Sequence, residues 1–103
     1  MAAFSGFKER VFRETAKIPK GRVSTYARIA NAIGSPDAAR AVGNALNRNR
    51  DKKVPCHRVV RSNGEVGGFA RGMKKKIRIL KSEGIEIRNG KLANFGESQH
   101  LNS

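Results

Sequence analysis

The sequence is poor in cysteine and in aromatic residues. It has one cysteine, no tryptophan and one tyrosine among 103 residues. A single cysteine cannot form an internal disulfide, which fits a reducing compartment. Together with the two histidines, His57 and His100, it supplies too few ligands for a closed zinc site. We therefore expect no metal, no cofactor and an intracellular location, in the cytoplasm and nucleoid or in a nucleus.

Long apolar runs are also missing. No stretch approaches the roughly 20 apolar residues that a membrane span needs, and the N-terminal segment lacks the apolar centre of a signal peptide. Only 38% of the residues are apolar, which allows one small domain with a thin core. We expect residues 1–95 to form that domain as a monomer with no membrane contact. Residues 96–103 are expected to be a disordered tail.

Acidic residues are few, whereas basic ones are abundant. Lys and Arg outnumber Asp and Glu by 22 to 8, which gives a net charge of +14. Such a density favours a polyanion as partner, because each basic side chain that meets a phosphate releases a condensed counterion. A ribosome-type RNA binder, or a basic surface that only keeps the chain in solution, would explain the charge as well. We favour nucleic-acid binding.

Two segments carry apolar residues at helical spacing with charges on the other face. The first spans residues 4–17 and can be capped by Ser5, and the second runs from about Met73 to Ser82 with Gly84 just past its end. The apolar positions are Phe7, Val11 and Phe12 in the first, and Met73, Ile77 and Leu80 in the second.

Between these segments the pattern predicts a helix-turn-helix. Ser24 is the expected N-cap of the first helix, and Gly34 ends it. Ser35 caps the second helix, which runs to about Asn49. Further on, residues 85–95 predict a β-hairpin with Asn89-Gly90 at the turn. The fold class is thus mainly α with a small β-hairpin, a winged-helix-like helix-turn-helix DNA-binding domain.

The second helix of this pair begins with small residues around one arginine. Ala38, Ala39 and Gly43 would let its backbone approach another surface closely, and Arg40 stands among them. Close packing against another helix explains the small residues equally well. Arg40 favours insertion into a nucleic-acid groove.

Cys56 and His57 form the one pairing of a nucleophile with a base. A thiolate is needed for attack, so Cys56 requires a base, a cation or a helix terminus to lower its pKa. Sequence neighbours interact when the backbone is bent, and Pro55 makes such a bend plausible. The alternative is a buried structural cysteine beside a histidine satisfied in the core.

Three motifs together resemble the C-terminal domain of the O6-alkylguanine-DNA alkyltransferase family. They are VPCHRVV at 54–60, RAVGNALNRN at 40–49 and NGEVGGFARG at 63–72. The family's active-site motif, Pro-Cys-His-Arg-Val, stands whole at 55–59, and the likeness runs from about Phe4 to Leu92. The family domain that usually precedes this one has no counterpart in the sequence. Since that domain generally carries no catalytic residue, we expect the chemistry to be retained.

The resemblance implies direct repair of O6-alkylguanine, and of O4-alkylthymine by the same chemistry, in double-stranded DNA. The lesion base is flipped out of the helix, and its alkyl group passes to the protein in a single turnover. Cys56 would accept the alkyl group, His57 would act as its base through a water molecule, and Glu83 would orient the histidine. Tyr26 would crowd the adjacent phosphate and donate a proton to the departing guanine.

The remaining implied residues bind DNA or shape the substrate pocket. Arg40 would fill the gap left by the flipped base, from the minor groove, and Asn49 would tighten the hinge before the active-site loop. Phe69 and Ala70 stand where several relatives have tyrosine and serine lining the guanine pocket. The DNA-binding set is Arg40, Tyr26, Ala38, Ala39, Gly43 and Asn47. The pocket and hinge set is Asn49, Pro55, Arg58, Val59, Phe69 and Ala70.

Two other functions explain part of the sequence. Alkyltransferase-like proteins share this compact domain and bind lesions without repairing them, but they typically replace the acceptor cysteine, which is present here as Cys56. An architectural or regulatory helix-turn-helix protein accounts for the charge and for Arg40. It leaves the 55–58 motif and Glu83 unexplained.

Overall fold

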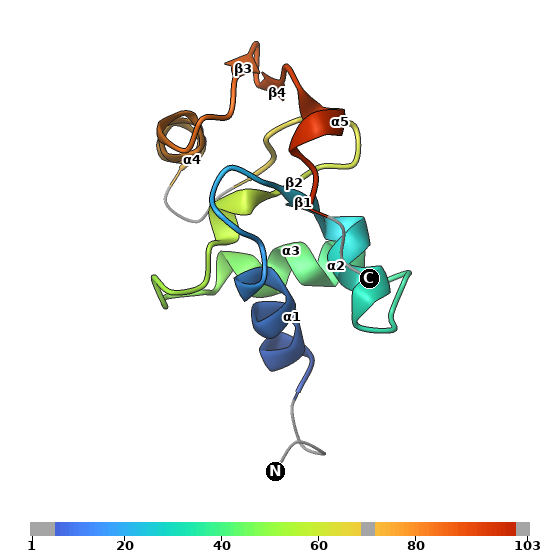
Figure 1. The fold of residues 1–103 in the computed structure, drawn as a ribbon. Helices are drawn as coiled ribbons and strands as arrows, with labels where there is room; N and C mark the ends of the chain where they lie inside the picture. The colour runs from blue at the N-terminus through green and yellow to red at the C-terminus, as the bar shows by residue number, and fades with distance from the viewer. Residues whose placement is uncertain (1–5, 69–71, 101–103) are drawn as a thin grey trace.

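The computed structural model describes residues 6–68 and 72–100. Within these ranges no helix has the length and apolar character to cross a membrane. Figure 1 shows the three N-terminal helices in one half of the molecule and α4, the hairpin and α5 in the other, with a short strand pair between them. The elements in chain order are α1 (Phe7–Ala16), β1 (Ser24–Thr25), α2 (Tyr26–Ala32), α3 (Ala39–Asn47), η2 (Cys56–Arg58), β2 (Val59–Val60), α4 (Met73–Ser82), β3 (Ile87–Arg88), β4 (Lys91–Leu92) and α5 (Phe95–Ser98).

The helical half encloses the larger apolar cluster. Helices α1, α2 and α3 pack on one another, and Cys56 belongs to the cluster they share. Its buried members are Val11, Ile18, Ile29, Ala30, Val42, Ala45, Leu46, Cys56 and Val59. Most of these residues are β-branched or small.

The second half packs α4 against the hairpin. The cluster there contains Val23, Val60, Val66, Leu80, Ile85, Ile87 and Leu92. Helix α4 spans Met73–Ser82, as predicted. The hairpin is also confirmed: β3 pairs antiparallel with β4, and Asn89 and Gly90 have φ of 53° and 77°. Two consecutive residues with positive φ are the requirement of a type I′ turn, which the Asn-Gly pair satisfies.

A parallel strand pair joins the two halves. Ser24 pairs with Val59 and Thr25 with Val60, so the strand before α2 lies beside the strand after η2. The expectation that Ser24 caps α2 was wrong, because Ser24 belongs to β1. Thr25 is the N-cap, and its hydroxyl accepts the Arg28 amide at 3.0 Å.

The second helix of the helix-turn-helix begins later than predicted. Gly34 ends α2 with φ of +79°, its amide bonds to Asn31 O, and the Ser35 amide bonds to Ala30 O at 2.9 Å. These two bonds are a Schellman motif. Ser35 is thus occupied in closing α2, and its carbonyl accepts the Ala38 amide in a turn. Helix α3 therefore starts at Ala39 rather than directly after Ser35.

The same closing motif places Glu83. Gly84, with φ of +92°, bonds to Lys81 O, and the Ile85 amide bonds to Leu80 O. Glu83 is therefore the C-cap of α4, at the point where the chain turns back to bury Ile85. At the other end of the molecule, α1 starts at Phe7 with Gly6 as N-cap, and the predicted cap, Ser5, lies outside the described residues.

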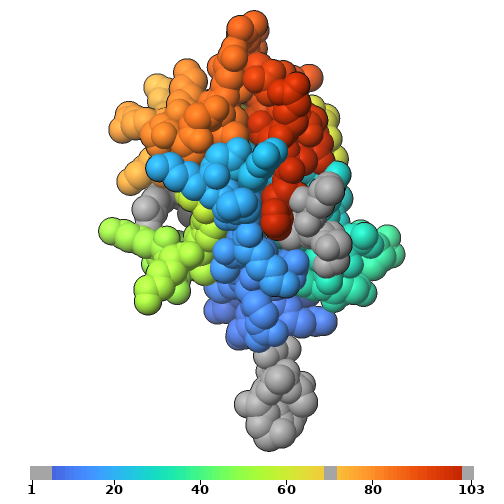
Figure 2. Space-filling model, in the orientation of Figure 1, coloured from blue at the N-terminus to red at the C-terminus, as the bar shows by residue number. Residues whose placement is uncertain are grey.

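The chain remains ordered past residue 95, which corrects the predicted disordered tail for residues 96–100. Helix α5 is followed by a bridge between Val23 and Gln99. The Val23 amide donates to Ser98 O at 2.8 Å, and the His100 amide donates to Val23 O at 2.6 Å. Val23 is fully buried, so its backbone groups need protein partners, and this segment supplies them. Figure 2 shows the C-terminal segment seated beside residues 18–23.

Candidate active site and nucleic-acid interface

Cys56, the candidate nucleophile, lies on a tight turn. Pro55 precedes a single 3₁₀ turn formed by Cys56–Arg58, in which the Arg58 amide bonds to Pro55 O at 2.9 Å. Cys56 retains 9% of its surface, so the sulfur is nearly enclosed. The turn leads directly into β2, which fixes it to β1 and thereby to the start of α2.

Asn49 spans the loop between α3 and this turn. Its side-chain oxygen accepts the Asp51 amide at 2.9 Å, and its Nδ2 lies 2.9 Å from Asp51 O and 2.9 Å from Cys56 Sγ. An N–H donor aimed at sulfur stabilises a thiolate more than a thiol, because hydrogen bonds to charged acceptors are stronger. Asn49 therefore both fixes the loop and contacts the candidate nucleophile.

Glu83 holds the two residues that follow Cys56. Its Oε2 lies 2.9 Å from His57 Nε2 and 2.7 Å from Arg58 Nη2, and its Oε1 accepts Arg58 Nε at 3.0 Å. Arg58 also donates to Ile18 O at 2.8 Å. The fork-shaped pairing fixes the carboxylate, and the carboxylate fixes the imidazole. Nδ1 is then the ring nitrogen of His57 that Glu83 does not hold.

The surroundings of Glu83 and His57 shift the pKa values of both side chains. Burial pushes the pKa of Glu83 up, but hydrogen bonds from Arg58 and His57 outweigh it and leave the pKa lowered. Burial lowers the pKa of His57, and the hydrogen bond and charge of Glu83 oppose this only in part. Glu83 is thus an anion and His57 a neutral base at neutral pH, which is the state that proton removal from a thiol requires.

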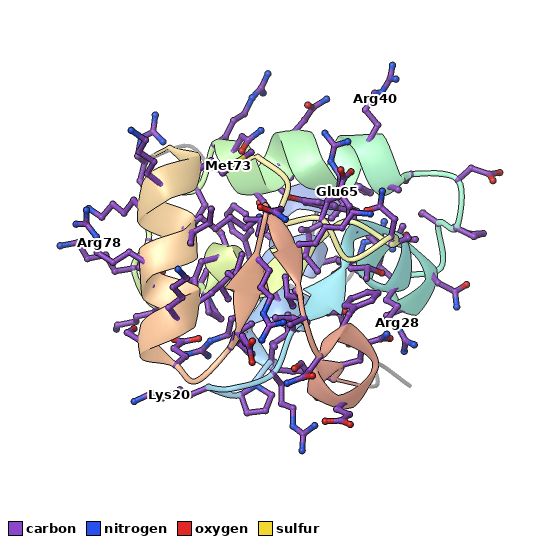
Figure 3. All side chains as sticks on the ribbon, turned by 90° about the horizontal axis from the view of Figure 1, so that it is seen from above. Lys20, Arg28, Arg40, Glu65, Met73 and Arg78 are labelled. Carbon is purple, nitrogen blue, oxygen red and sulfur yellow. The ribbon has the colours of Figure 1, made fainter. Side chains whose placement is uncertain are left out.

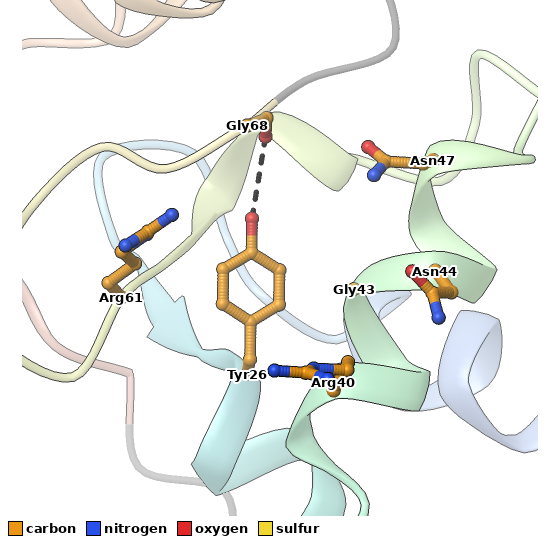
Figure 4. Close-up of a pocket in the computed structure, with 7 residues that line it drawn as sticks. All are labelled: Tyr26, Arg40, Gly43, Asn44, Asn47, Arg61 and Gly68. Atoms are coloured by element: carbon orange, nitrogen blue, oxygen red, sulfur yellow. Dashed lines mark hydrogen bonds between the residues drawn. The ribbon is translucent and has the colours of Figure 1, made fainter.

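A pocket of about 310 Å³ opens between α3 and the loop after β2 (Figure 4). Tyr26 stands at its centre, and its hydroxyl donates to Gly68 O at 3.4 Å. The lining residues are Tyr26, Arg40, Gly43, Asn44, Asn47, Arg61 and Gly68. Four of the predicted DNA-binding residues, Tyr26, Arg40, Gly43 and Asn47, are therefore brought together.

The exposed face of α3 fits close approach by a large partner. Arg40 is exposed and extends outward from the helix in Figure 3. Gly43 faces the Tyr26 ring, and a Cβ there would stand 3.7 Å from that ring, which is an ordinary contact. Ala38 and Ala39 do not line the pocket: Ala38 packs against the helical core cluster, and both are half-buried at the start of α3.

The other predicted pocket residues fall in different places. Pro55 and Val59 are buried, and Val59 presents its carbonyl to Lys76 rather than to open space. Arg58 is turned to Glu83 and Ile18, away from the pocket. Phe69 and Ala70 lie outside the described residues. No group of three or more metal-ligating side chains occurs among residues 6–68 and 72–100.

Sequence reasoning missed four residues of this region. Asn44 lines the pocket from α3, and Arg61 and Gly68 line it from the loop after β2. Lys76 was overlooked because the predicted apolar face of α4 included Met73. The structure buries Lys76 completely and leaves Met73 50% exposed. A lysine within a run of three lysines gives no sign of burial by its residue type. The sign that the sequence does give is its spacing of four residues before Leu80, which places the two side chains on one face of the helix.

The fold and the site define a helix-turn-helix DNA-binding domain that carries a Cys–His–Glu arrangement behind its second helix. The family model "6-O-methylguanine DNA methyltransferase, DNA binding domain" matches residues 6–85. The chain belongs to this family.

Named relatives agree with the match. The chain is 46% identical over 82 residues to a methylated-DNA–protein-cysteine methyltransferase of Saccharolobus islandicus, and 47% identical over 77 residues to a bifunctional methyltransferase/endonuclease of Picrophilus torridus. These matches cover 79% and 74% of this chain. They span only 52% and 26% of the two relatives, so the likeness concerns one part of each.

Solved structures show the same fold. Atl1 of S. pombe, in a complex with DNA containing O6-carboxymethylguanine, superposes with a TM-score of 0.82 at 34% identity, over 91% of this chain and 94% of that one. OGT of Mycobacterium tuberculosis in complex with DNA gives a TM-score of 0.73 at 40% identity, over 76% of this chain and 48% of that one. The helix-turn-helix prediction is thereby confirmed.

Proposed function

We propose that the chain repairs O6-alkylguanine in duplex DNA by transferring the alkyl group to Cys56 in a single turnover. The observation that carries this proposal is the assembly around the sulfur. Asn49 donates to Cys56 Sγ at 2.9 Å, and the adjacent His57 is held by Glu83 at 2.9 Å. A purely structural cysteine needs neither a hydrogen-bonded amide nor an oriented base. Family membership supplies the substrate class.

The chemistry needs each of these groups in turn. His57, through a water molecule, takes the thiol proton, and Glu83 stabilises the imidazolium that forms. The sulfur then attacks the alkyl carbon in line, so that an S–C bond forms as the C–O6 bond breaks. The electron pair goes to the guanine, which receives a proton from Tyr26 and leaves neutral. The thioether is stable, so each molecule acts once.

The target base reaches the sulfur only by leaving the helix, at a cost of a few kcal/mol. The exposed face of α3 would rest in the minor groove, and Arg40 would fill the vacated space in the stack. The net charge of +14 offsets the cost through phosphate contacts. A single copy of the chain suffices for these contacts, on DNA in a nucleoid or nucleus.

The decisive test is intact-protein mass spectrometry after incubation with a duplex that contains one O6-methylguanine. We expect a gain of one methyl mass, located by peptide mapping to the peptide with Cys56. The variant Cys56→Ser should bind the same duplex and gain nothing. A wild-type protein that binds but never gains mass would refute transfer.

The second candidate is a lesion sensor that binds without repair. Two observations favour it: the near-complete overlap with Atl1 and the 9% exposure of Cys56, which leaves little room for an incoming base. Under this function the affinity for the methylated duplex would exceed that for the plain duplex, with an unchanged protein mass. An architectural protein would bind both duplexes equally.

A further inference from the structure

The outer face of α4 carries basic side chains and no acidic one. Lys74, Lys75, Arg78 and Lys81 are all exposed, and the sequence of the helix, MKKKIRILKS, contains neither Asp nor Glu. Residues four and seven positions apart lie on the same face of a helix, so Lys74, Arg78 and Lys81 form one row, and Lys75 stands beside it. These side chains are called the α4 basic face below.

No acidic side chain that the structure describes pairs with this face. None of its four side chains forms an ion pair among the described residues. The two acidic residues that follow the helix are occupied elsewhere, because Glu83 pairs with Arg58 and His57, and Glu86 pairs with Arg88. The α4 basic face is therefore a patch of positive charge without a counter-charge in the described fold.

This arrangement makes the free protein less stable. Lys74 and Lys75 stand in the first turn of α4, where a positive charge opposes the helix dipole. Arg78 lies four residues after Lys74 and three before Lys81, and like charges at these spacings repel each other. A face that only keeps a protein in solution is served better by charges of both signs. Phosphates would relieve both unfavourable effects, so the face is complementary to a nucleic-acid backbone.

The α4 basic face continues from the pocket beside α3. A second cavity, of about 360 Å³, shares Arg61 and Gly68 with the pocket that contains Tyr26, and it extends to Met73 at the start of α4. Lys74 is the next residue along the chain. DNA that follows the surface from the pocket toward α4 therefore meets the first residue of the basic face directly after this cavity.

The exposed face of α3 and the α4 basic face point in different directions. In Figure 3, Arg40 extends from α3 at one edge of the molecule and Arg78 extends from α4 at another, while Met73 lies at the end of α4 nearer to α3. A duplex seated on α3 reaches Arg78 only if its flank turns toward α4. Such bending costs deformation energy, which the contacts that it makes possible can offset.

We propose that the α4 basic face binds the phosphate backbone on one flank of the lesion in the same duplex and draws that flank toward α4. The face from Lys74 to Lys81 extends about 10 Å along the helix, a length that holds about three phosphates of one DNA strand. Contacts to phosphates read no sequence, but they fix the orientation of the duplex. This inference rests on the duplex binding of the proposed function and not on methyl transfer.

The test varies the DNA on one side of the lesion at a time. A duplex of about one helical turn, roughly 10 base pairs, is centred on O6-methylguanine and then extended by a second turn on its 5′ side or on its 3′ side. Fluorescence anisotropy gives the affinities. For the wild type, extension on one side should raise the affinity at least about tenfold in roughly 0.1 M salt. Extension on the other side should change it by less than about threefold.

Two double variants with the same net charge separate this contact from a general effect of charge. Lys74→Gln/Arg78→Gln should lose the gain from extension, and its slope of log affinity against log salt on the extended duplex should be smaller by about 2. It should bind the short duplex within about twofold of the wild type. Lys17→Gln/Lys20→Gln removes exposed charges from the segment between α1 and β1, where Figure 3 places Lys20 far from Arg40, and should keep both the gain and the slope.

The stability of the variants guards against a loss of folding. Glutamine forms helices about as well as lysine and arginine, and the substitutions relieve repulsion within α4. Lys74→Gln/Arg78→Gln should therefore melt no lower than the wild type. A lower melting temperature would contradict the repulsion on which the proposal depends.

Three binding results would overturn the proposal. They are an equal gain from extension on both sides, equal losses of affinity in the two double variants, and sedimentation that shows two duplexes on one protein. The mass of the Cys56 peptide reports methyl transfer separately. An unchanged mass together with the expected loss in Lys74→Gln/Arg78→Gln means that the proposed function has failed and the α4 contact stands. A mass gain without one-sided dependence on length means the reverse.

Discussion

Glu83 Oε2 lies 2.9 Å from Nε2 of His57, although 26 residues separate them in sequence. The contact exists because the Schellman motif at the end of α4 places Glu83 at the C-cap, where it meets the turn that carries the nucleophile. The same carboxylate holds Arg58 with both oxygens. One side chain thus determines the orientation of the two residues that follow Cys56.

Glu83→Gln should therefore damage chemistry and folding together. The Arg58 guanidinium, 17% exposed, loses its anion, which costs on the order of 3 kcal/mol of folding free energy. Methyl transfer should fall at least about tenfold, because the imidazole loses its orienting charge. Glu86→Gln is the control, since Glu86 pairs with Arg88 on the surface, and it should cost less than about 1 kcal/mol. Chemical denaturation and single-turnover kinetics give both values; equal stability of the two variants would contradict the clamp.

Gly43→Ala should separate DNA binding from stability. A methyl group at this position meets the Tyr26 ring at 3.7 Å without a clash. In a helix interior alanine is favoured over glycine by roughly 0.5 to 1 kcal/mol, so the melting temperature should rise slightly. The affinity for duplex DNA should fall, because the added methyl group takes up space in the pocket that Gly43 and Tyr26 line. Fluorescence anisotropy would detect this, and unchanged affinity would show that α3 does not approach DNA at Gly43.

Asn49→Ala should make Cys56 less reactive. The variant loses the donor that lies 2.9 Å from the sulfur, together with the Asp51 contacts that tighten the loop. Alkylation by iodoacetamide at fixed pH should slow by several fold. Asn63→Ala is a matched control, because the Asn63 side chain accepts the amide of Glu65 at 3.0 Å in the same local geometry. A similar slowing in both variants would assign the effect to general loosening.

Lys76 gives stability a defined dependence on pH. Its pKa is about 7 in the folded protein and near 10.5 in the unfolded chain. Between these values the unfolded chain binds a proton that the folded protein lacks, so stability should rise with pH across that window and be lower below pH 7. Lys76→Met should remove this slope. Thermal melts of both proteins from pH 6 to pH 10 would reveal it, and parallel curves would mean that Lys76 titrates normally.

Arg40→Ala should weaken base flipping more than plain-duplex binding. The guanidinium extends from α3 and acts on the stack only after a base has left it. A fluorescent base analogue beside the lesion should report reduced extrusion of the base. The affinity for undamaged duplex should fall only by the contribution of one phosphate contact. Arg78→Ala, on the outer face of α4, is the control for charge alone. Normal extrusion by Arg40→Ala would exclude intercalation.

The sequence was most informative where the cause of a structure is local. The bounds of α4 and the Asn89-Gly90 turn follow from neighbouring residues with restricted backbone preferences, and both were predicted correctly. The start of α3 was misplaced because Ser35 has two possible uses. In the structure Ser35 closes α2 and does not cap α3. The sequence alone does not show which of the two uses is favoured.

Features that depend on residues far away in the sequence were not predicted. The residues near Ser24 do not indicate that it pairs with Val59. Residues 96–100 do not indicate that their backbone groups bond to Val23. Lys76 is the clearest case, since its burial depends on Val59, Gly68 and Tyr26 from three other segments. The proposed catalytic roles of Cys56, His57 and Glu83 were predictable only through resemblance to a family, because Glu83 alone is an ordinary acidic residue.

The two-rung pairing of β1 with β2 has a mechanical consequence. Tyr26 follows β1 directly, and the turn with Cys56 ends directly before β2. Under the proposed function, a force that the DNA exerts on the first turn of α2 would therefore reach the strand next to the Cys56 turn through paired backbone. DNA binding and the position of the sulfur would then be coupled through the four strand residues of β1 and β2.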